Sequence, residues 1–347
     1  MIKIGKLKIG LKNKPIIIAE MSGNHNQSLS RALKIVKAAA TAGAHMFKLQ
    51  TYTADTMTLN LNKGDFVIKD KNLWTGHSLY NLYKKAHTPL EWHKPIMKKA
   101  KELGMVCFSS AFDETAVEFL EKLNVPAYKI ASFEITHLPL IKKVAETGKP
   151  IIVSTGLATL DEIKEAVETM KKAGCKKYVL LKCTSKYPAP PENSNVLTIP
   201  NLRKLFKCEV GLSDHTIGIG SSLSAIAHGA TIIEKHFTLS KKDRGVDSAF
   251  SSDPKEFKML IKESLNTWKS LGKINYGPSR IEKPSLKFRR SLYVAEDMKK
   301  GEKFTKKTLR IIRPGKGLAP KYYSKIIGRK TNKNLKKGTA VKWGCIL

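Results

Sequence analysis

The 347-residue sequence predicts an α/β protein, a (β/α)8 TIM barrel followed by a small second domain. Up to residue 271, eight short apolar runs alternate with longer amphipathic stretches, a pattern typical of parallel strands covered by helices. The count of eight favours a closed barrel over an open, doubly wound sheet. No GxGxxG or GxxxxGK[ST] motif follows the first run, which argues against a nucleotide-binding sheet. The eight runs are residues 15–22, 44–51, 105–110, 127–132, 150–155, 178–185, 208–214 and 230–237.

The segments between these runs have helical spacing. Residues 30–43 and 160–174 place apolar side chains on one helical face and end in a glycine, as helix C-termini often do. The longest interruption, residues 53–93, separates the second run from the third. A connection of that length in a compact barrel is more often functional than idle.

The composition changes near residue 272. We expect a barrel domain at 1–271, a linker rich in Gly, Pro and Lys at 272–288, and a second domain at 289–347. The last segment has the pattern of short strands and turns. Because so short a piece offers little core, we expect it to dock on another part of the assembly.

The overall composition excludes several classes of protein. Apolar residues make up 41% and charged residues 27%, which is ordinary for a globular chain and excludes disordered, collagenous and disulfide-scaffold proteins. No apolar run approaches the roughly 20 residues that span a bilayer, and the first residues do not have a signal-peptide pattern. Five widely spaced cysteines without a CxxC motif indicate reduced thiols and a cytoplasmic location. These are Cys107, Cys175, Cys183, Cys208 and Cys345.

The charge is unusual: 63 Lys and Arg against 29 Asp and Glu give a net charge of +34. The excess is densest in residues 281–347, where 20 basic residues face 4 acidic ones. Such a surface could bind nucleic acid or another polyanion, or attract small anionic substrates. The lysines are scattered, without an aromatic strip or zinc-finger spacing, so a solvated basic surface is favoured over a nucleic-acid interface.

Polar residues stand at the end of every predicted strand. A TIM barrel builds its active site at the carboxyl ends of its strands, so this one-sided placement predicts an enzyme. The residues concerned are Glu20, Lys48, Gln50, Ser109, Ser110, Lys129, Ser132, Ser154, Thr184, Ser213, His215, Glu234 and His236.

Two histidines end neighbouring strands. Side chains two residues apart share a strand face, so His215 lies on the face of Ser213 and His236 on that of Glu234. Two imidazoles make half of a divalent metal site and leave positions for water and substrate oxygens. The alternative is that each ring is a neutral, hydrogen-bonded core residue; with two rings on adjacent strands we favour the metal.

Two lysines lie within predicted strands. A buried ammonium is costly unless it meets an anion, so Lys48 and Lys129 predict a phosphate and carboxylate site. The alternative is that each lysine extends to the barrel rim. Glu20 has no cation near it in the sequence, so a catalytic or sugar-binding role and simple solvation are equally open. The serines expected to join the two lysines are Ser110, Ser132, Ser154 and Ser213.

Seven ordered motifs together resemble the sialic acid synthase family over nearly the whole chain: IAEMSGNHNQS, AGAHMFKLQTY, AYKIASFE, IIVSTG, LKCTSKYPAP, GLSDHT and IIEKHFT. The segments RRSLYVAEDMKKGEKFT and RPGKGLAP resemble that family's C-terminal antifreeze-like (SAF, β-clip) domain. The resemblance implies an enzyme that condenses phosphoenolpyruvate (PEP) with an N-acetylated sugar aldehyde, giving a nine-carbon 2-keto acid and phosphate.

The resemblance also implies roles for individual residues. It assigns a divalent metal, Mn²⁺ or Mg²⁺ and possibly Co²⁺, to His215 and His236, and it makes Glu20 and Glu234 the candidate acid/base groups. It assigns PEP binding to Lys48, Ser110, Lys129, Ser132, Ser154, Ser185 and Ser213. It assigns sugar binding to Gln50, Tyr187, Glu234, Asp247, Phe288 and Arg313.

Within the family, residues 73–93 and 244–257 look like those of pseudaminic acid synthases. The implied sugar is 2,4-diacetamido-2,4,6-trideoxy-L-altrose; formation of legionaminic or N-acetylneuraminic acid is the alternative. Ser185 stands where neuraminate synthases tend to carry asparagine, and GVD precedes Ser248 where they have GPD. We further expect a homodimer in which the small basic tail reaches over and completes the partner's site, with Arg313 supplying a fork of donors.

Overall fold

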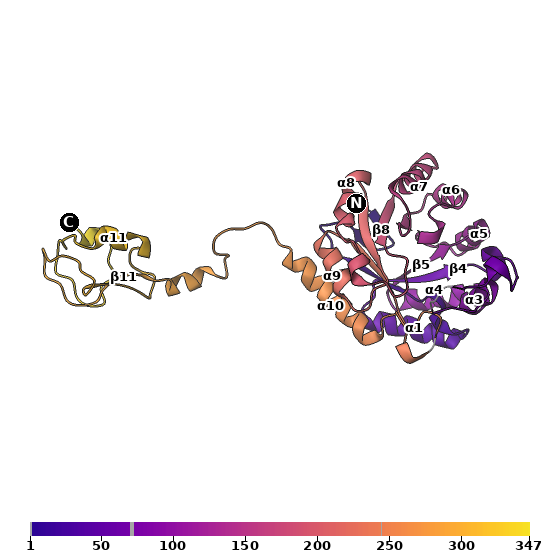
Figure 1. The fold of residues 1–347 in the computed structure, drawn as a ribbon, viewed down its shortest axis with the longest axis horizontal. Helices are drawn as coiled ribbons and strands as arrows, with labels where there is room; N and C mark the ends of the chain where they lie inside the picture. The colour runs from indigo at the N-terminus through magenta and orange to yellow at the C-terminus, as the bar shows by residue number, and fades with distance from the viewer. Residues whose placement is uncertain (1, 70–72, 244) are drawn as a thin grey trace. The chain divides into compact units, whose positions relative to one another are not determined.

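The computed structural model describes residues 2–69, 73–243 and 245–347. Eight parallel strands close into a barrel in sequence order, with the last strand hydrogen-bonded to the first, which confirms the predicted (β/α)8 fold (Figure 1). Each of the eight expected apolar runs contributes one strand. The barrel strands are β3 (Ile16–Glu20), β4 (Met46–Thr51), β5 (Val106–Ala111), β6 (Tyr128–Ile130), β7 (Ile151–Ser154), β8 (Tyr178–Cys183), β9 (Glu209–Asp214) and β10 (Ile232–His236).

Helices form a ring around the strands (Figure 1). The main core lies between the two layers, where outward-facing strand residues such as Val153 and Ile233 are fully buried. The expected helix after β3 ends at Gly43, whose φ of +100° is the left-handed conformation that suits glycine. The helices of this part of the chain are α1 (Leu29–Ala42), α2 (Ala54–Met57), α3 (Leu79–Ala86), α4 (Leu90–Glu102), α5 (Glu114–Lys122), α6 (Leu138–Glu146), α7 (Leu160–Lys172), α8 (Thr198–Phe206), α9 (Gly220–Ala227) and α10 (Pro254–Ser270).

A short hairpin at the N-terminus was not expected from the sequence. Its strands β1 (Ile2–Ile4) and β2 (Leu7–Ile9) pair in antiparallel fashion. Ile4 and Ile9 are fully buried in one cluster with barrel-interior residues such as Phe108. The hairpin therefore packs against the inside of the barrel at its N-terminal end, away from the strand ends that carry the polar residues.

The long interruption between β4 and β5 folds back onto the end of β3. It contains α2 and α3, and α3 contacts the 3₁₀ turn η1 (Ser22–His25) that follows β3. The side chain of Gln27 donates hydrogen bonds to the carbonyls of Lys85 and His87, at 3.0 and 2.8 Å. The interruption is thereby tied to the carboxyl end of the barrel, while residues 70–72 within it lie outside the described residues.

The chain divides into two compact units after Gly272. The second unit contains the antiparallel strands β11 (Ser291–Val294) and β12 (Leu309–Ile312) and the short helix α11 (Tyr323–Ile326). It has more core than its sequence led us to expect, because nine buried residues, among them Phe304, form a cluster of its own. The bounds of the linker, 272–288, remain a prediction.

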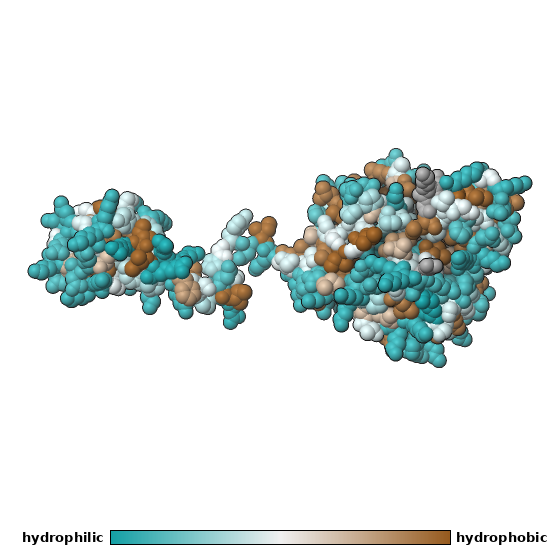
Figure 2. Space-filling model, turned by 60° about the horizontal axis from the view of Figure 1, so that its bottom comes forward, coloured by the Kyte–Doolittle hydropathy of each residue, from teal (hydrophilic) through white to brown (hydrophobic). Residues whose placement is uncertain are grey.

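The hydrophilic surface, the lengths of the helices and the cysteines agree with what the composition predicted. Hydrophilic residues cover most of the visible surface of both units (Figure 2). Among the described helices, none is both long and apolar enough to cross a membrane. The five cysteines are free thiols, as expected.

Candidate active site

Four charged side chains meet inside the carboxyl end of the barrel. Glu20 and Lys48 are register partners on β3 and β4, and Glu234 comes from β10. The Nζ atom of Lys48 lies 2.8 Å from Glu20 Oε2 and 2.8 Å from Glu234 Oε1. Lys129, on β6, has its Nζ 3.9 Å from Glu234 Oε1. All four side chains are buried, so neither lysine extends to the rim and the alternative of solvated lysines is wrong.

Burial and mutual attraction set the charges in this cluster. Burial would lower the pKa of Lys48, but Glu20 and Glu234 outweigh it and raise that pKa, so the ammonium stays charged. Burial would raise the pKa of Glu234, yet Lys129 and Lys48 outweigh it and lower that pKa. Burial raises the pKa of Glu20, because the ammonium it shares only partly compensates. Burial also lowers the pKa of Lys129 to about 8, against the opposing pull of Glu234.

Serine hydroxyls surround the lysines. Lys129 Nζ donates to Ser154 Oγ at 2.7 Å and Lys48 Nζ to Ser110 Oγ at 3.4 Å. Ser213 Oγ donates to Glu234 Oε1 at 3.4 Å. The predicted PEP residues of the barrel strands are therefore brought together in one cluster that contains two ammonium groups and several hydroxyls. This donor set matches a small anion that carries phosphate and carboxylate groups.

The hydroxyls of Ser132 and Ser185 both lie next to the backbone of Gly156. The Gly156 N–H donates to Ser132 Oγ at 3.2 Å. A Cβ on this glycine would lie 2.2 Å from Ser185 Oγ and 2.7 Å from Ser132 Oγ, closer than side-chain atoms can approach. Glycine is thus required for the two hydroxyls to converge here, two residues after Ser154, which ends β7.

The two expected metal ligands lie side by side, with ring centroids 5.4 Å apart. His215 Nδ1 donates to the Thr184 carbonyl at 2.9 Å, which fixes the ring and leaves Nε2 free to bind a metal. Burial and the neighbouring His215 lower the pKa of His236 well below its usual range, so its ring is neutral, as metal binding requires.

Among the described residues, the buried Nδ1 of His236 finds no hydrogen-bond partner, and it lies 3.7 Å from Asp247 Oδ2. Within the described part of the chain, no three His, Cys, Asp or Glu side chains converge as a ready metal cluster. His236 supplies a neutral imidazole. Burial opposes the charge of His215, but Cys183 and the Thr184 carbonyl outweigh it and raise the pKa of that ring, so His215 would bind a metal by releasing a proton. Two imidazoles fit a divalent ion that also takes oxygen atoms from water and substrate.

Three of the residues expected at the sugar adjoin the imidazoles. Gln50 Nε2 donates to Ser22 Oγ at 3.1 Å, and Ser22 Oγ in turn donates to Asp247. The Tyr187 ring lies 4.3 Å from that of His215. Of the other three, Glu234 lies in the charged cluster with Lys48. Phe288 and Arg313 belong to the second unit, and their assignment to the sugar site stays a prediction.

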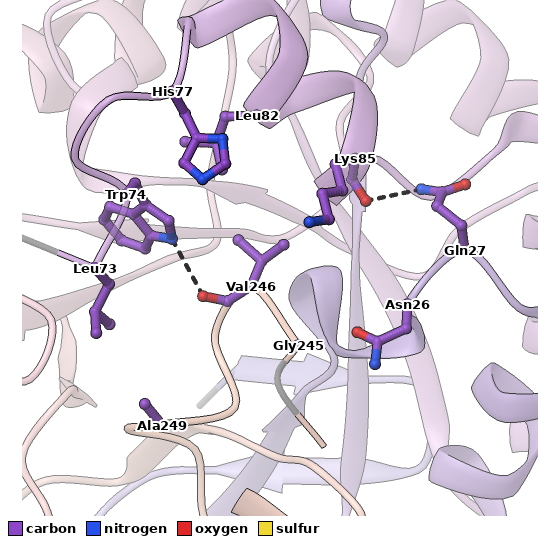
Figure 3. Close-up of a pocket in the computed structure, with 10 residues that line it drawn as sticks. All are labelled: Asn26, Gln27, Leu73, Trp74, His77, Leu82, Lys85, Gly245, Val246 and Ala249. Atoms are coloured by element: carbon purple, nitrogen blue, oxygen red, sulfur yellow. Dashed lines mark hydrogen bonds between the residues drawn. The ribbon is translucent and has the colours of Figure 1, made fainter. Parts of the chain in front are cut away.

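An open pocket of about 440 Å³ adjoins this side of the site (Figure 3). One wall comes from the interruption, with Trp74, His77 and Lys85, and the other from residues 245–249. Trp74 Nε1 donates to the Val246 carbonyl at 3.2 Å, and the Trp74 ring lies 5.9 Å from that of Tyr187. The pocket is thereby linked to the imidazoles through two aromatic rings. Residue 244, in the second of the motifs that indicated the sugar, lies outside the described residues.

Sequence reasoning missed three residues of this region. Glu134 follows β6 in the 3₁₀ turn η3 (Ser132–Glu134), and burial raises its pKa to about 7, although Lys129 opposes the shift. Ser22, two residues after Glu20, connects Gln50 to Asp247. Cys183 has its Sγ 3.8 Å from His215 Nδ1; burial would raise its pKa, but His215 outweighs this and lowers it to about 6. Cys183 ends β8, and its place at a strand end is the signal that could have found it; Ser22 and Glu134 lie in the 3₁₀ turns that follow β3 and β6.

The chain matches known proteins along its length. The model of the NeuB family matches residues 35–276, and that of the SAF domain matches residues 289–347. The chain is 45% identical to a pseudaminic acid synthase of Campylobacter jejuni over 95% of this chain and 96% of that protein. It is 44% identical to the pseudaminic acid synthase of Helicobacter pylori over 94% of this chain and 96% of that protein.

A solved structure has the same fold. The N-acetylneuraminic acid synthetase of Leptospira borgpetersenii, crystallised with citrate, superimposes with a TM-score of 0.74 at 31% identity. The match covers 83% of this chain and 95% of that one. The family model spans more than half of the chain, and the relatives exceed 30% identity over almost all of it. On these grounds the chain belongs to the NeuB family, the sialic acid synthases, with a TIM barrel and a C-terminal SAF domain.

Proposed function

We propose that this enzyme condenses PEP with 2,4-diacetamido-2,4,6-trideoxy-L-altrose and water to give pseudaminic acid and phosphate. The observation that carries the proposal is the buried cluster of Lys48, Lys129, Glu20 and Glu234 beside two imidazoles at the carboxyl end of the barrel. The identity to pseudaminic acid synthases over nearly the whole chain supports the choice of product.

PEP binding is assigned to the lysines and serines. The ammonium of Lys129 donates a hydrogen bond to the hydroxyl of Ser154. The hydroxyls of Ser132 and Ser185 converge at Gly156, two residues after Ser154. An anion that reaches these donors replaces the hydration it loses with fixed hydrogen bonds and charge. The net charge of +34 also favours the approach of an anionic substrate, more strongly at low salt.

His215 and His236 would hold the divalent ion, Mn²⁺ or Mg²⁺. When bound, the ion supplies Lewis-acid polarisation of the sugar aldehyde oxygen. The residues around it orient the sugar: Asp247 lies beside His236, Tyr187 packs against His215 with its ring tilted, and Gln50 reaches Asp247 through Ser22.

The reaction forms one carbon–carbon bond, and at C2 it replaces the bond to the phosphate oxygen by a bond to the oxygen of water. C3 of PEP attacks the aldehyde carbon of the open-chain sugar, whose oxygen takes up a proton. Water then adds to C2 and loses one proton. The new C2 hydroxyl loses the second proton as the ketone forms, and the phosphate leaves with its bridging oxygen and takes up that proton. These proton transfers need groups whose pKa is near the working pH.

The buried carboxyl groups of Glu20, Glu134 and Glu234 differ in how well they can exchange protons. Glu234 lies between two ammonium groups and is held ionised, so we assign it to positioning and balancing Lys48 and Lys129. Glu20 and Glu134 both have raised pKa values, and that of Glu134 is about 7. We therefore assign proton exchange with the substrates to Glu20 and Glu134.

The sugar specificity and the assembly rest on segments at the rim. Residues 73–85, part of the segment that resembles pseudaminic acid synthases, line the pocket beside Tyr187 (Figure 3). We propose that Phe288 and Arg313 complete the sugar site of the other subunit in a swapped homodimer. The free cysteines support the cytoplasmic location that we propose.

The test is metal-dependent release of phosphate from PEP with a panel of aldoses. We expect the trideoxyaltrose to turn over fastest, N-acetylmannosamine to be poor, and chelation of the metal to stop the reaction. Faster turnover of N-acetylmannosamine, or of the precursor of legionaminic acid, would replace the proposed sugar by that one. A protein that releases no phosphate with any aldose, but binds nucleic acid with steep salt dependence, would instead be a polyanion binder.

A further inference from the structure

A second buried ion pair lies directly behind the two imidazoles. Lys235 on β10 and Asp214 on β9 are register partners, with Nζ 3.0 Å from Oδ2. Their side chains are 2% and 1% exposed. Strand alternation directs them away from the barrel interior, toward the helix layer, where Ser222 of α9 donates to Asp214 Oδ2 at 2.5 Å.

Stability alone does not explain this pair. The same faces of β9 and β10 otherwise carry Val210, Leu212 and Ile233, all in the main hydrophobic core. A buried ion pair is often no more stabilising than apolar residues of similar size, and its better attested use is to specify one geometry. The contacts of Lys235 and Asp214 indicate which geometry that is.

The pair fixes the backbone on both sides of His215. Asp214 Oδ1 accepts hydrogen bonds from the backbone N–H and the hydroxyl of Thr216, at 2.8 and 2.7 Å. Lys235 Nζ donates to the Thr216 carbonyl at 2.6 Å. The residues before and after His215 are therefore tied to one ammonium, and the residue that carries it directly precedes His236.

We propose that Lys235 and Asp214 are positioning residues, which hold His215 and His236 at the separation and orientation that a divalent ion requires. Neither residue touches the substrates; each acts through the backbone of the neighbouring histidine. The inference rests on the proposed function only in that these two histidines bind the metal. Mutation of residues that orient metal ligands typically lowers the affinity for the metal ten- to a hundredfold.

The test measures metal binding directly on the full-length protein. Wild type and Lys235→Met are titrated with Mn²⁺ by calorimetry without substrates, and the visible absorption spectrum of bound Co²⁺ reports the ligand geometry. We expect Lys235→Met to weaken Mn²⁺ binding about tenfold or more and to change the Co²⁺ spectrum. The KM for PEP should stay within about twofold, because Lys48 and Lys129 lie on other strands. Asp214→Asn, which keeps the side-chain shape, is the second variant if Lys235→Met does not fold.

The matched control is Arg203→Met. Arg203 pairs with Glu209 at 2.7 Å and donates to the Gly229 carbonyl at 2.8 Å, so it connects the start of β9 to the segment that precedes β10, at the end of the barrel opposite the histidines. This variant should lower the melting temperature and leave Mn²⁺ affinity unchanged. A folded Lys235→Met or Asp214→Asn with wild-type metal affinity would overturn the inference. Wild type that binds no Mn²⁺ would overturn the metal assignment and this inference with it.

Discussion

The Nζ atom of Lys48 lies 2.8 Å from Oε1 of Glu234, and about a twentieth of each side chain is exposed. The same ammonium is shared with Glu20, at an equal distance. One cation thus compensates two buried carboxylates, and the second lysine of the site, Lys129, is too far from Glu234 for a hydrogen bond. Lys48 is thus hydrogen-bonded to both carboxylates, whereas Lys129 acts on Glu234 through its charge alone and can donate a hydrogen bond to a bound anion.

Lys48→Met should therefore destabilise the barrel and abolish activity. Breaking a buried ion pair by removing one partner costs about 3–5 kcal/mol, because the charge left behind is unpaired. Adding Glu20→Gln removes one of the two unpaired carboxylates, so we expect the double variant to regain stability but not turnover. Urea unfolding and phosphate release measure the two effects. Equal free energies of unfolding for the single and double variants would contradict this account.

Lys129 should make PEP binding depend on pH. Because burial lowers its pKa to about 8, the free enzyme loses this charge as the pH rises through 8. We expect the KM for PEP to rise above pH 8 while the KM for the sugar changes little. Lys129→Ala should have a raised KM for PEP at every pH, and an equal rise for both substrates would indicate general damage. Lys182→Ala is the control, since this half-buried lysine on β8 donates to the Cys183 carbonyl and not to the serines of the site.

Glu134 should set the acid limb of the pH profile. Its pKa is raised to about 7 by burial, so the carboxylate that can accept a proton from water is lost as the pH falls below 7. We expect kcat to fall there in wild type, and Glu134→Gln to have a low kcat without this limb. In the unfolded chain the Glu134 carboxyl ionises near pH 4.5. The folded protein binds this proton more tightly, so wild type loses stability as the pH rises from about 4.5 to 7. Glu134→Gln should lack this loss, and an unchanged acid limb in the variant would exclude Glu134 as the base.

Gly156→Ala should weaken PEP binding without unfolding the barrel. The added Cβ would occupy the space where Ser132 and Ser185 converge, and so displace both hydroxyls. We expect the KM for PEP to rise about tenfold or more, since each lost hydrogen bond to a charged group is worth about 1.5–3 kcal/mol. Gly220→Ala is the control, because nothing lies within 4 Å of its Cβ position. A normal KM for PEP in Gly156→Ala would remove the two serines from the binding site.

The barrel could be predicted because its eight apolar runs with polar ends alternate regularly with helical segments. Lys48 and Glu234 could be placed in one site because parallel strands bring their carboxyl ends together. The N-terminal hairpin could not be predicted, because its two three-residue strands lie outside the alternation that identified the equally short β6. Glu134 was missed because a 3₁₀ turn, and not strand parity, directs its side chain. The ion pair of Lys235 and Asp214 was missed because outward-facing charges only make sense once their register is known.

The role of the C-terminal unit is the prediction that needs two chains. Arg313 lies exposed in the second unit, 41 residues after the division at Gly272, and that unit has a core of its own. An independently folded unit on an exposed linker can serve the neighbouring subunit as readily as its own. Arg313→Ala and His215→Ala should each be nearly inactive. The first variant lacks the guanidinium of the C-terminal unit, and the second lacks the imidazole of the barrel site.

Co-expression of the two variants distinguishes the arrangements. If the tail serves the partner, each mixed dimer contains one site with an intact barrel and an intact tail, so activity returns to roughly a quarter of wild type with random pairing. If the tail serves its own barrel, the His215→Ala chain lacks the imidazole and the Arg313→Ala chain lacks the guanidinium at every site. Mixed dimers would then be as inactive as their parents, and no activity from folded, dimeric mixtures would show that the tail acts within its own chain.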